Sequence, residues 1–363
     1  MSQTPRVEPH DVQASPVPVA GGRRGAGAAH AKAILFGEHA VVYGAPAIAI
    51  PVDSLTAEAT IERGGPAGLR IASSLYTGPV DGAPARLTPV VTAIRASLER
   101  AGLADLARSE AGAADAGAGA VADGAAGASA ADAPAVADGA LVTIASSIPH
   151  ERGLGSSAAV AAAIARAAFD LAGAELDGET LFDLIQTAER VAHGKPSGID
   201  ARTVAATGAI RFTRGAVAPI RIGAPLILAF ADTGHPGSTA QAVGSVQALR
   251  EREPASTDAL LSRLAEIAEH SIEDLAAGDR AAVGAAMSEA HAILHRVGVS
   301  SDHLDAIVAA ACAAGASGAK LTGGGLGGCV IAVASSTAHA EQIGAAMRDA
   351  GAERTWTVEV PAA

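Results

Sequence analysis

Residues 141–160 read LVTIASSIPHERGLGSSAAV, and this stretch decides the fold. A β-rich apolar run, 141–148, ends at Pro149, and a glycine–serine loop then opens a segment in which Val160, Ile164 and Leu171 have helical spacing. Glycine lets the backbone approach an anion closely, and the start of a helix offers free N–H groups and a partial positive charge. The loop therefore indicates a phosphate site, although an ordinary glycine turn with a serine N-cap fits the local pattern as well. The candidate phosphate-binding residues are Gly153, Leu154, Gly155, Ser156, Ser157 and Ala158.

Two better-known nucleotide motifs do not fit this chain. Residues 153–158 satisfy the loose G-x-G-x-x-G/A pattern of dinucleotide-binding folds, but the acidic strand end that such folds need about 20 residues later is missing. Residues 323–328, GGGLGG, match the pattern too, but they lead into a strand rather than a helix. The chain contains no GxxxxGK[ST]. The sequence therefore excludes a P-loop NTPase and disfavours a dehydrogenase.

The length and charge of the chain narrow its class. A chain of 363 residues is long enough for two domains with cores of their own. Its net charge of −12 makes it a poor candidate for nonspecific binding to nucleic acid or to anionic membranes. Cys312 and Cys329 form neither a disulfide framework nor a zinc pattern, which fits the cytoplasm, and no apolar run has transmembrane length. Residues 1–28 lack the apolar core of a signal peptide and are expected to be a disordered tail.

Hydrophobic periodicity predicts two domains, with a boundary near 215–225. The first, 29–218, contains an Ala/Gly/Asp-rich segment, 107–140, that lacks large apolar anchors and is expected to be a flexible insertion; its scattered Gly and Asp argue against an Ala-rich helix. The second covers 219–363. Strands are predicted at 31–36, 47–50, 55–61, 69–72, 141–148, 209–213, 226–231, 320–322, 329–334 and 354–360, and helices at 89–101, 157–171, 179–192, most of 237–314, and 338–350.

A second candidate site combines a buried carboxylate with an acid that follows a turn. Glu189 lies about two turns after Leu181, at the edge of the buried face of its helix, so its carboxylate needs a metal ion or a salt bridge. Gly194 and Pro196 end that helix, and Asp200 is expected to lie in the constrained loop that follows. Such a residue is either a positioned acid–base group or a helix cap.

Two more segments place polar groups or glycines beside apolar strands. Lys32 and the run GEHAVVYG at 37–44 belong to a stretch otherwise fit for burial. Lys32 can hold an anion or lower the pKa of a reacting hydroxyl, or it can be a simple strand-edge lysine. The run KLTGGGLGGC at 320–329 puts many glycines between two strands, which indicates a backbone close to a ligand or a long flexible turn.

Three weaker candidates complete the set. His291 and His295 have the i, i+4 spacing of zinc sites, but Ala292 stands where the HExxH motif has glutamate, so we expect no metal there. The run HER at 150–152 lies beside the glycine loop, and the sequence leaves its role open. The run DTGHPGST at 232–239 is predicted to be a strand-to-helix loop that touches substrate or caps the helix.

In order along the chain, four segments resemble the motifs of the GHMP kinases, and most closely those of the mevalonate kinase branch. Galactokinases also carry GEH in the first motif, but usually with an Asp-Tyr pair soon after, whereas phosphomevalonate kinases tend to carry GEY. The resemblance extends from about residue 29 to the C-terminus, without the insertion. The four segments are ILFGEHAVVYGAPAIA at 34–49, GLGSSAA at 153–159, AERVAHGKPSGID at 188–200 and KLTGGGLGGC at 320–329.

The resemblance implies an α+β fold of two domains. The N-terminal domain would be similar to ribosomal protein S5 domain 2, and the C-terminal domain would be ferredoxin-like, with ATP and substrate between them. The implied activity is the phosphorylation of the mevalonate 5-hydroxyl by ATP with Mg²⁺. The cytoplasm as compartment and the absence of nucleic-acid and membrane partners are expected from the charge and the cysteines given above. Members of the family often dimerise, which makes a homodimer a candidate assembly.

The resemblance also implies roles for individual residues. By matching position, Asp200 would guide the proton of the substrate hydroxyl, and Lys32 would stabilise the alkoxide that develops. Ser157 and Glu189 would hold Mg²⁺ between the phosphates, which the Gly153–Ala158 loop would cradle. The residues expected to contact the substrate are Lys32, Glu38, His39, Asp200, Thr322 and Gly325.

Several positions depart from the family pattern; they leave the kinase chemistry intact and bear on the choice of substrate. His30-Ala31 stands where Pro-Gly is usual, Ala201 where Asn often follows the catalytic aspartate, Gly324 and Leu326 alter the last motif, and the run HER replaces small residues before the glycine loop. The alternatives are a phosphomevalonate kinase or a mevalonate-3-kinase-like enzyme. A non-catalytic sensor of the same fold is disfavoured, because it should have lost the charged groups of the site, and this chain retains all three: Lys32, Glu189 and Asp200.

Overall fold

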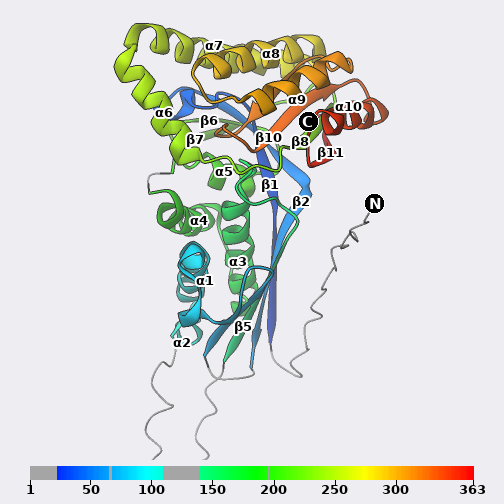
Figure 1. Ribbon diagram of the computed structural model, residues 1–363. Coiled ribbons are helices and arrows are strands. Elements are labelled where there is room, and N and C mark those ends of the chain that lie inside the picture. The colour runs from blue at the N-terminus through cyan, green and yellow to red at the C-terminus, as the bar shows by residue number, and fades with distance from the viewer. Residues whose placement is uncertain (1–22, 65–67, 109–138, 195) are drawn as a thin grey trace, which may run out of the picture.

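The structure, a computed structural model, describes residues 23–64, 68–108, 139–194 and 196–363 (Figure 1). Most of the predicted tail and of the predicted insertion falls on residues 1–22 and 109–138, which lie outside the described residues. Within the described ranges the chain forms two sheets, each with its own helices, and this confirms the α+β architecture.

The first sheet has seven strands among the described residues, and they come from the N-terminal part of the chain and from 210–219. The strands are β1 (Arg24–Phe36), β2 (Ala47–Arg63), β3 (Leu69–Ser73), β4 (Thr77–Pro79), β5 (Ala140–Ser146), β6 (Ile210–Thr213) and β7 (Ala216–Pro219). Their order is β4-β3-β5-β2-β6-β7, and β1 pairs antiparallel with β2. The predicted strands at 47–50 and 55–61 are one continuous strand, β2.

The N-terminal end of β1 contradicts the expectation that residues up to 28 are a disordered tail. β1 begins at Arg24, seven residues before the predicted strand. Gly25 and Gly27 lie directly on a helix: a Cβ atom on Gly25 would be 2.2 Å from the carbonyl oxygen of Ala167, and one on Gly27 would be 2.3 Å from that of Ala163. The sequence RGAGA is therefore rich in small residues because a strand and a helix meet there, and composition alone did not distinguish this from a tail.

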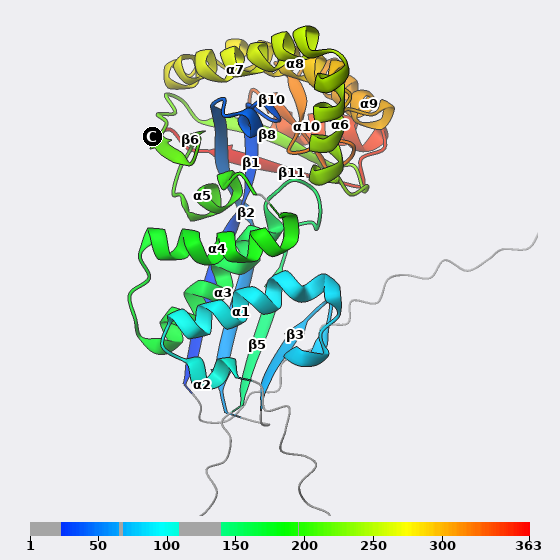
Figure 2. The same ribbon diagram turned by 90° about the vertical axis from the view of Figure 1, so that its left-hand side faces the viewer.

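The helices of the first domain lie on one side of its strands (Figures 1 and 2). They are α1 (Thr88–Arg100), α2 (Ala104–Ala107), α3 (Ser156–Ala172), α4 (Gly178–His193) and α5 (Ile199–Ala205), with short 3-10 turns η1 (Ala40–Tyr43), η2 (Val80–Gly82) and η3 (Ala85–Leu87). The alanines of α3 are almost all buried, because their short side chains let the helix approach β1 closely. This helix carries the predicted phosphate loop at its start.

The second domain has the βαββαβ order of a ferredoxin-like fold. Its strands are β8 (Leu226–Asp232), β9 (Ala319–Thr322), β10 (Cys329–Ala334) and β11 (Arg354–Val360), arranged antiparallel in the order β11-β8-β10-β9. Its helices are α6 (Thr239–Arg252), α7 (Pro254–Ala277), α8 (Arg280–Arg296), α9 (Asp302–Ala313) and α10 (Thr337–Asp349). The predicted division between residues 218 and 219 falls at the last strand of the first sheet, which ends at Pro219.

The two domains meet along the upper ends of β1 and β2, which extend beneath α7 and α8 (Figures 1 and 2). The turn η1, directly after β1, packs against α7. This junction brings the four predicted motif segments together.

No helix in the described part of the chain has the combination of length and apolarity needed to cross a bilayer.

Candidate functional site

The centre of the site is an ion pair between β1 and α5. The Nζ atom of Lys32 lies 2.8 Å from Oδ1 of Asp200. The lysine side chain is 3% exposed, whereas that of Asp200 is 31% exposed, so the carboxylate is the more accessible partner. Gly198, in the left-handed conformation, precedes α5, and Asp200 lies in the first turn of this helix rather than in the loop that we expected. The pair presents a buried cation and an accessible base side by side.

The glycine loop lies directly against Lys32. The backbone N–H of Lys32 donates to the carbonyl oxygen of Leu154 at 3.0 Å. Gly155 is the N-cap of α3 with φ +69°, and a Cβ atom there would lie 2.9 Å from Cγ of Lys32. Glycine at this position thus serves two needs, a left-handed backbone and room for the lysine stem.

The start of α3 matches an anion site better than a capped turn. No described side chain caps this helix, so the serine N-cap that the sequence allowed is not formed. The N–H groups of the first turn are therefore free to face a ligand, and the helix adds its partial positive charge. The side-chain oxygen of Ser156 is also buried without a hydrogen-bond partner among the described residues. The predicted loop residues 153–158 all lie at this helix start.

Ser157 and Glu189 meet across α3 and α4. The Ser157 hydroxyl donates to Oε1 of Glu189, and Nε2 of His193 lies 3.8 Å from the other carboxylate oxygen. Glu189 is 4% exposed, which confirms the predicted buried position. Burial raises the pKa of Glu189, and the nearby negative charge of Asp200 raises it further, while the Ser157 hydroxyl, His193 and Lys32 oppose the shift. Burial is therefore the main cost of keeping this carboxylate ionised.

This group of oxygen donors fits a magnesium ion. Mg²⁺ prefers carboxylate and hydroxyl oxygens, and it commonly takes only one or two carboxylates from the protein, because substrate phosphates and water supply its other ligands. Glu189 and Asp200 place two acidic groups near one lysine, and a divalent cation would offset both the cost of burying the Glu189 carboxylate and its repulsion from Asp200. Among the described residues, no group of three or more His, Cys, Asp or Glu side chains converges as a self-contained metal site. The site suits a metal that arrives with phosphate.

The predicted substrate residues after β1 lie at the domain junction. Glu38 is 1% exposed and pairs with the ammonium group of Lys320, which is fully buried in β9. Its second oxygen, Oε2, has no hydrogen-bond partner among the described residues. Burial raises the pKa of Glu38 and lowers the pKa of Lys320, and the contact between the two groups opposes both shifts.

His39 links the same turn to the glycine run of the second domain. Its Nε2 lies 2.9 Å from the carbonyl oxygen of Gly324, and burial lowers its pKa. The residue has φ +62°, which is uncommon outside glycine. A strained backbone at a buried histidine indicates that the surrounding structure fixes this side chain.

Thr322 and Gly325 lie at the junction but make internal contacts. The Thr322 hydroxyl donates to the carbonyl oxygen of Ile34 at 2.9 Å and accepts from the N–H of Ile34 at 3.2 Å. Gly325 has φ +83°, and a Cβ atom there would lie 2.1 Å from the carbonyl oxygen of Val299. The structure thus gives Thr322 a role in joining β9 to β1, and it gives Gly325 a role in packing; their contact with substrate stays a prediction.

Two ion pairs at the site were missed from the sequence. Lys320 lies within the last motif and received no predicted role, although a lysine inside an apolar strand needs a carboxylate partner. Arg152 pairs with Asp232 across the domain junction, and this answers the open question about the run HER. Both pairs join residues far apart in the chain, which only the fold brings together.

The weaker candidates do not form a second catalytic site. Oδ1 of Asp305 lies 3.1 Å from Nε2 of His291, and Oδ2 lies 2.8 Å from Nδ1 of His295. The carboxylate of Asp305 thus contacts both histidine rings. The run 232–239 does contain a cap, because the Ser238 side chain accepts from the N–H of Gln241 at the start of α6. Both features stabilise local structure.

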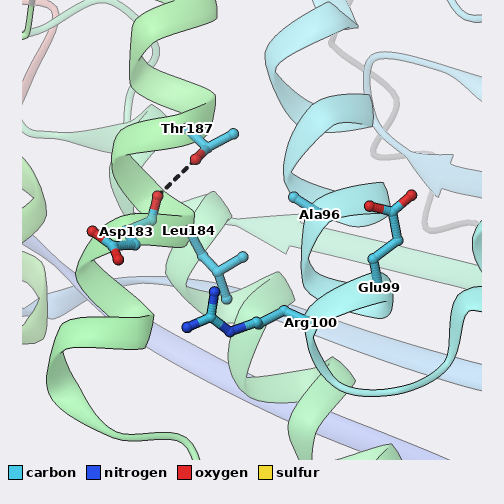
Figure 3. Close-up of a pocket in the computed structure, with 6 residues that line it drawn as sticks. All are labelled: Ala96, Glu99, Arg100, Asp183, Leu184 and Thr187. Atoms are coloured by element: carbon cyan, nitrogen blue, oxygen red, sulfur yellow. Dashed lines mark hydrogen bonds between the residues drawn. The ribbon is translucent and has the colours of Figure 1, made fainter.

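Two pockets in the described part of the chain lie away from this site. One pocket has a volume of about 360 Å³ and lies between α1 and α4. Figure 3 shows its lining residues, Ala96, Glu99, Arg100, Asp183, Leu184 and Thr187. A second pocket, of about 440 Å³, lies between η1 and α7, where Arg250 pairs with Asp258 at 2.5 Å and stacks over Tyr43. The predicted site residues are not among the described residues that line either pocket.

Family models match both halves of the chain. The model described as GHMP kinases N terminal domain matches residues 120–208, and that described as GHMP kinases C terminal matches residues 271–353. The first match contains the glycine loop, Glu189 and Asp200.

Curated relatives and solved structures agree with these matches. The chain is 33% identical to a mevalonate kinase of Thermococcus gammatolerans over 84% of its own length and 88% of the relative, and 32% identical to one of Pyrococcus furiosus over 89% and 92%. Its structure is similar to that of the L. major mevalonate kinase in complex with R-mevalonate, with a TM-score of 0.75, 26% identity, and coverage of 95% of this chain and 97% of that one.

Proposed function

The chain belongs to the mevalonate kinase family of the GHMP kinases, and from this premise we propose that it transfers the γ-phosphoryl group of ATP to the 5-hydroxyl of mevalonate. The observation that carries the proposal is the contact of 2.8 Å between Lys32 and Asp200 beside the open N-terminus of α3. A phosphate-binding helix start next to a buried cation and an accessible base is the arrangement that phosphoryl transfer to an alcohol requires.

Asp200 and Lys32 have different roles at the substrate hydroxyl. The carboxylate of Asp200 is the more accessible of the two groups and accepts the hydroxyl proton as the oxygen attacks phosphorus. The ammonium group of Lys32 is held by β1 and by the glycine loop, and it stabilises the negative charge that develops on that oxygen. Because both groups are fixed before substrate arrives, little reorganisation is needed at the moment of reaction.

The N-terminus of α3 and the 153–158 loop hold the phosphates through backbone N–H groups. Ser157 and Glu189 are the residues that would hold Mg²⁺, which when bound neutralises charge on the phosphates. The contact between the Ser157 hydroxyl and the Glu189 carboxylate supports this assignment, because both groups offer oxygen ligands that Mg²⁺ accepts.

The turn after β1 is proposed to seat the substrate. Oε2 of Glu38 has a free acceptor position among the described residues, and His39 is held next to the glycine run of the second domain. A small hydroxy acid offers hydroxyl groups to such acceptors.

Cys312 and Cys329 are both free thiols, which supports the cytoplasm as the compartment. A homodimer belongs to the same proposal, and the mass in solution tests it.

A coupled ADP-release assay tests the proposed function directly. The purified chain is given Mg·ATP with mevalonate, phosphomevalonate, galactose or homoserine in separate reactions, and the product from mevalonate is identified by phosphorus NMR. We expect mevalonate to be strongly preferred and its 5-hydroxyl to carry the phosphate. Preference for phosphomevalonate, or phosphate on the 3-hydroxyl, would move the chain to a neighbouring activity. Tight binding of mevalonate and nucleotide without turnover would indicate a sensor.

A further inference from the structure

Arg152 connects the phosphate loop to the second domain. It directly precedes Gly153, the first glycine of the loop. Its Nε donates to Oδ1 of Asp232 at 2.6 Å, and its NH1 group donates to the carbonyl oxygen of His150 at 3.1 Å. The side chains of Arg152 and Asp232 are only 14% and 7% exposed. One guanidinium group thus fixes the turn before the loop and ties it to β8.

Asp232 is a rigid anchor for this contact. It ends β8, where it pairs in register with Cys329 of β10 on one side and with Arg354 of β11 on the other. Its Oδ1 also accepts from the N–H of Gly234 at 2.9 Å, and its carbonyl oxygen accepts from the N–H of Glu353 at 2.8 Å. The second sheet therefore fixes the position of the Asp232 carboxylate, and this carboxylate in turn fixes the position of the Arg152 side chain.

Backbone contacts surround the ion pair and close the same junction. The N–H of Gly237 donates to the carbonyl oxygen of Glu151 at 2.8 Å. A Cβ atom on Gly153 would lie 3.2 Å from Cα of Gly323, and one on Gly328 would lie 3.0 Å from the carbonyl oxygen of Arg152. The phosphate loop of the first domain is thus seated on two loops of the second, with the ion pair as its charged contact.

We infer that Arg152 and Asp232 act as a positioning pair that holds the phosphate loop against the second domain and so sets the affinity for the nucleotide. The inference rests on the proposed kinase function, since it assumes that the loop binds phosphate. The pair is largely buried, so loss of either partner leaves an uncompensated charge at the domain junction. The planar guanidinium group adds direction that an ammonium group cannot supply.

Titration calorimetry with Mg·ADP, together with steady-state kinetics, tests the pair in the full chain. The variants are Arg152→Gln, Asp232→Asn and the double variant. We expect each single change to weaken Mg·ADP binding and raise KM for ATP by about tenfold to a hundredfold, because the loop loses its fixed position. We expect KM for mevalonate to stay within about twofold, and the double variant to be no weaker than the worse single variant, since the two residues act as a unit.

Arg211→Gln is the matched control. Arg211 of β6 pairs with Glu269 of α7, so this change also breaks an arginine–carboxylate contact between the domains, but away from the loop. We expect the control to bind Mg·ADP like the unchanged chain. Should Arg152→Gln fail to fold, Asp232→Asn carries the same comparison.

Three results would overturn the positioning role. One is unchanged Mg·ADP affinity in the loop variants, and another is an equal loss in the control. The third is tighter binding in Asp232→Asn, because a released Arg152 would then be acting on phosphate itself. Failure of the proposed function is seen separately, as the absence of mevalonate turnover in the unchanged chain, whereas the ADP titration needs no turnover.

Discussion

Replacing Lys320 by methionine probes the buried contact that joins the two domains beside the substrate turn. The change keeps the side chain unbranched and only one atom shorter, and it removes the ammonium group that faces Glu38. Glu38 would then be a carboxylate at 1% exposure, with Oε2 already lacking a partner among the described residues. Removing one partner of a buried ion pair costs about 3–5 kcal/mol, so we expect Lys320→Met to lower the free energy of unfolding by that amount.

The dependence of this loss on pH follows from the charge of Glu38. Burial already raises the pKa of this carboxyl group, and removal of Lys320 takes away the largest opposing effect. A carboxyl group with a raised pKa in the folded state favours folding at low pH, and that contribution is lost as the pH rises through the folded pKa. The penalty of Lys320→Met is therefore smaller in acid and larger at neutral pH.

Urea denaturation at several pH values measures this penalty, with Glu38→Gln/Lys320→Met as the matched control. Neutral groups of similar shape at both positions leave no buried charge, so the double variant should recover most of the loss. If the single variant is as stable as the unchanged chain at neutral pH, or if the double variant is the less stable of the two, then Glu38 and Lys320 are not a buried charge pair.

Three further changes test individual parts of the site. Gly155→Ala should lower the free energy of unfolding by about 1–2 kcal/mol, because residue 155 has a left-handed backbone, and it should lower kcat, because the new Cβ displaces the Lys32 side chain. Urea denaturation and turnover measure the two effects, and normal values for both would contradict the close approach of Gly155 to Lys32. Ser157→Ala should raise the Mg²⁺ concentration for half-maximal rate roughly tenfold, the equivalent of about 1.4 kcal/mol, and an unchanged magnesium dependence would remove this residue from the metal site. His39→Gln should make the loss of stability below pH 6.5 less steep. Burial lowers the pKa of His39 in the folded chain, so the unfolded chain binds the proton first as the pH falls, and this favours unfolding. Equal pH profiles of stability for the variant and the unchanged chain would contradict the lowered pKa.

Most of the secondary structure was predictable because local patterns and packing agree. The apolar faces at 157–171 and 179–192 correspond to α3 and α4, and the strands of the second sheet were placed within a residue or two. The start of β1 was not predictable from composition. Gly25 and Gly27 look like linker residues in sequence, and their purpose appears only when α3 packs on them.

The site was predictable where a motif kept charged groups together in an apolar context. Lys32, Glu189 and Asp200 were identified from such contexts, and the fold brings all three to the start of α3. The partners Lys320 and Asp232 were not identified. Each lies in a buried strand of the second domain, and nothing local indicates which residue of the first domain it meets. Pairings across a domain junction depend on the fold as a whole.

The most direct measurement is turnover and Mg·ADP affinity of Asp200→Asn, compared side by side with the unchanged chain. Loss of the base should slow phosphorylation of mevalonate by about a hundredfold to ten-thousandfold while nucleotide affinity stays nearly the same, because the helix start is untouched. A variant that phosphorylates mevalonate at close to the normal rate would contradict the assignment of Asp200 as the proton acceptor.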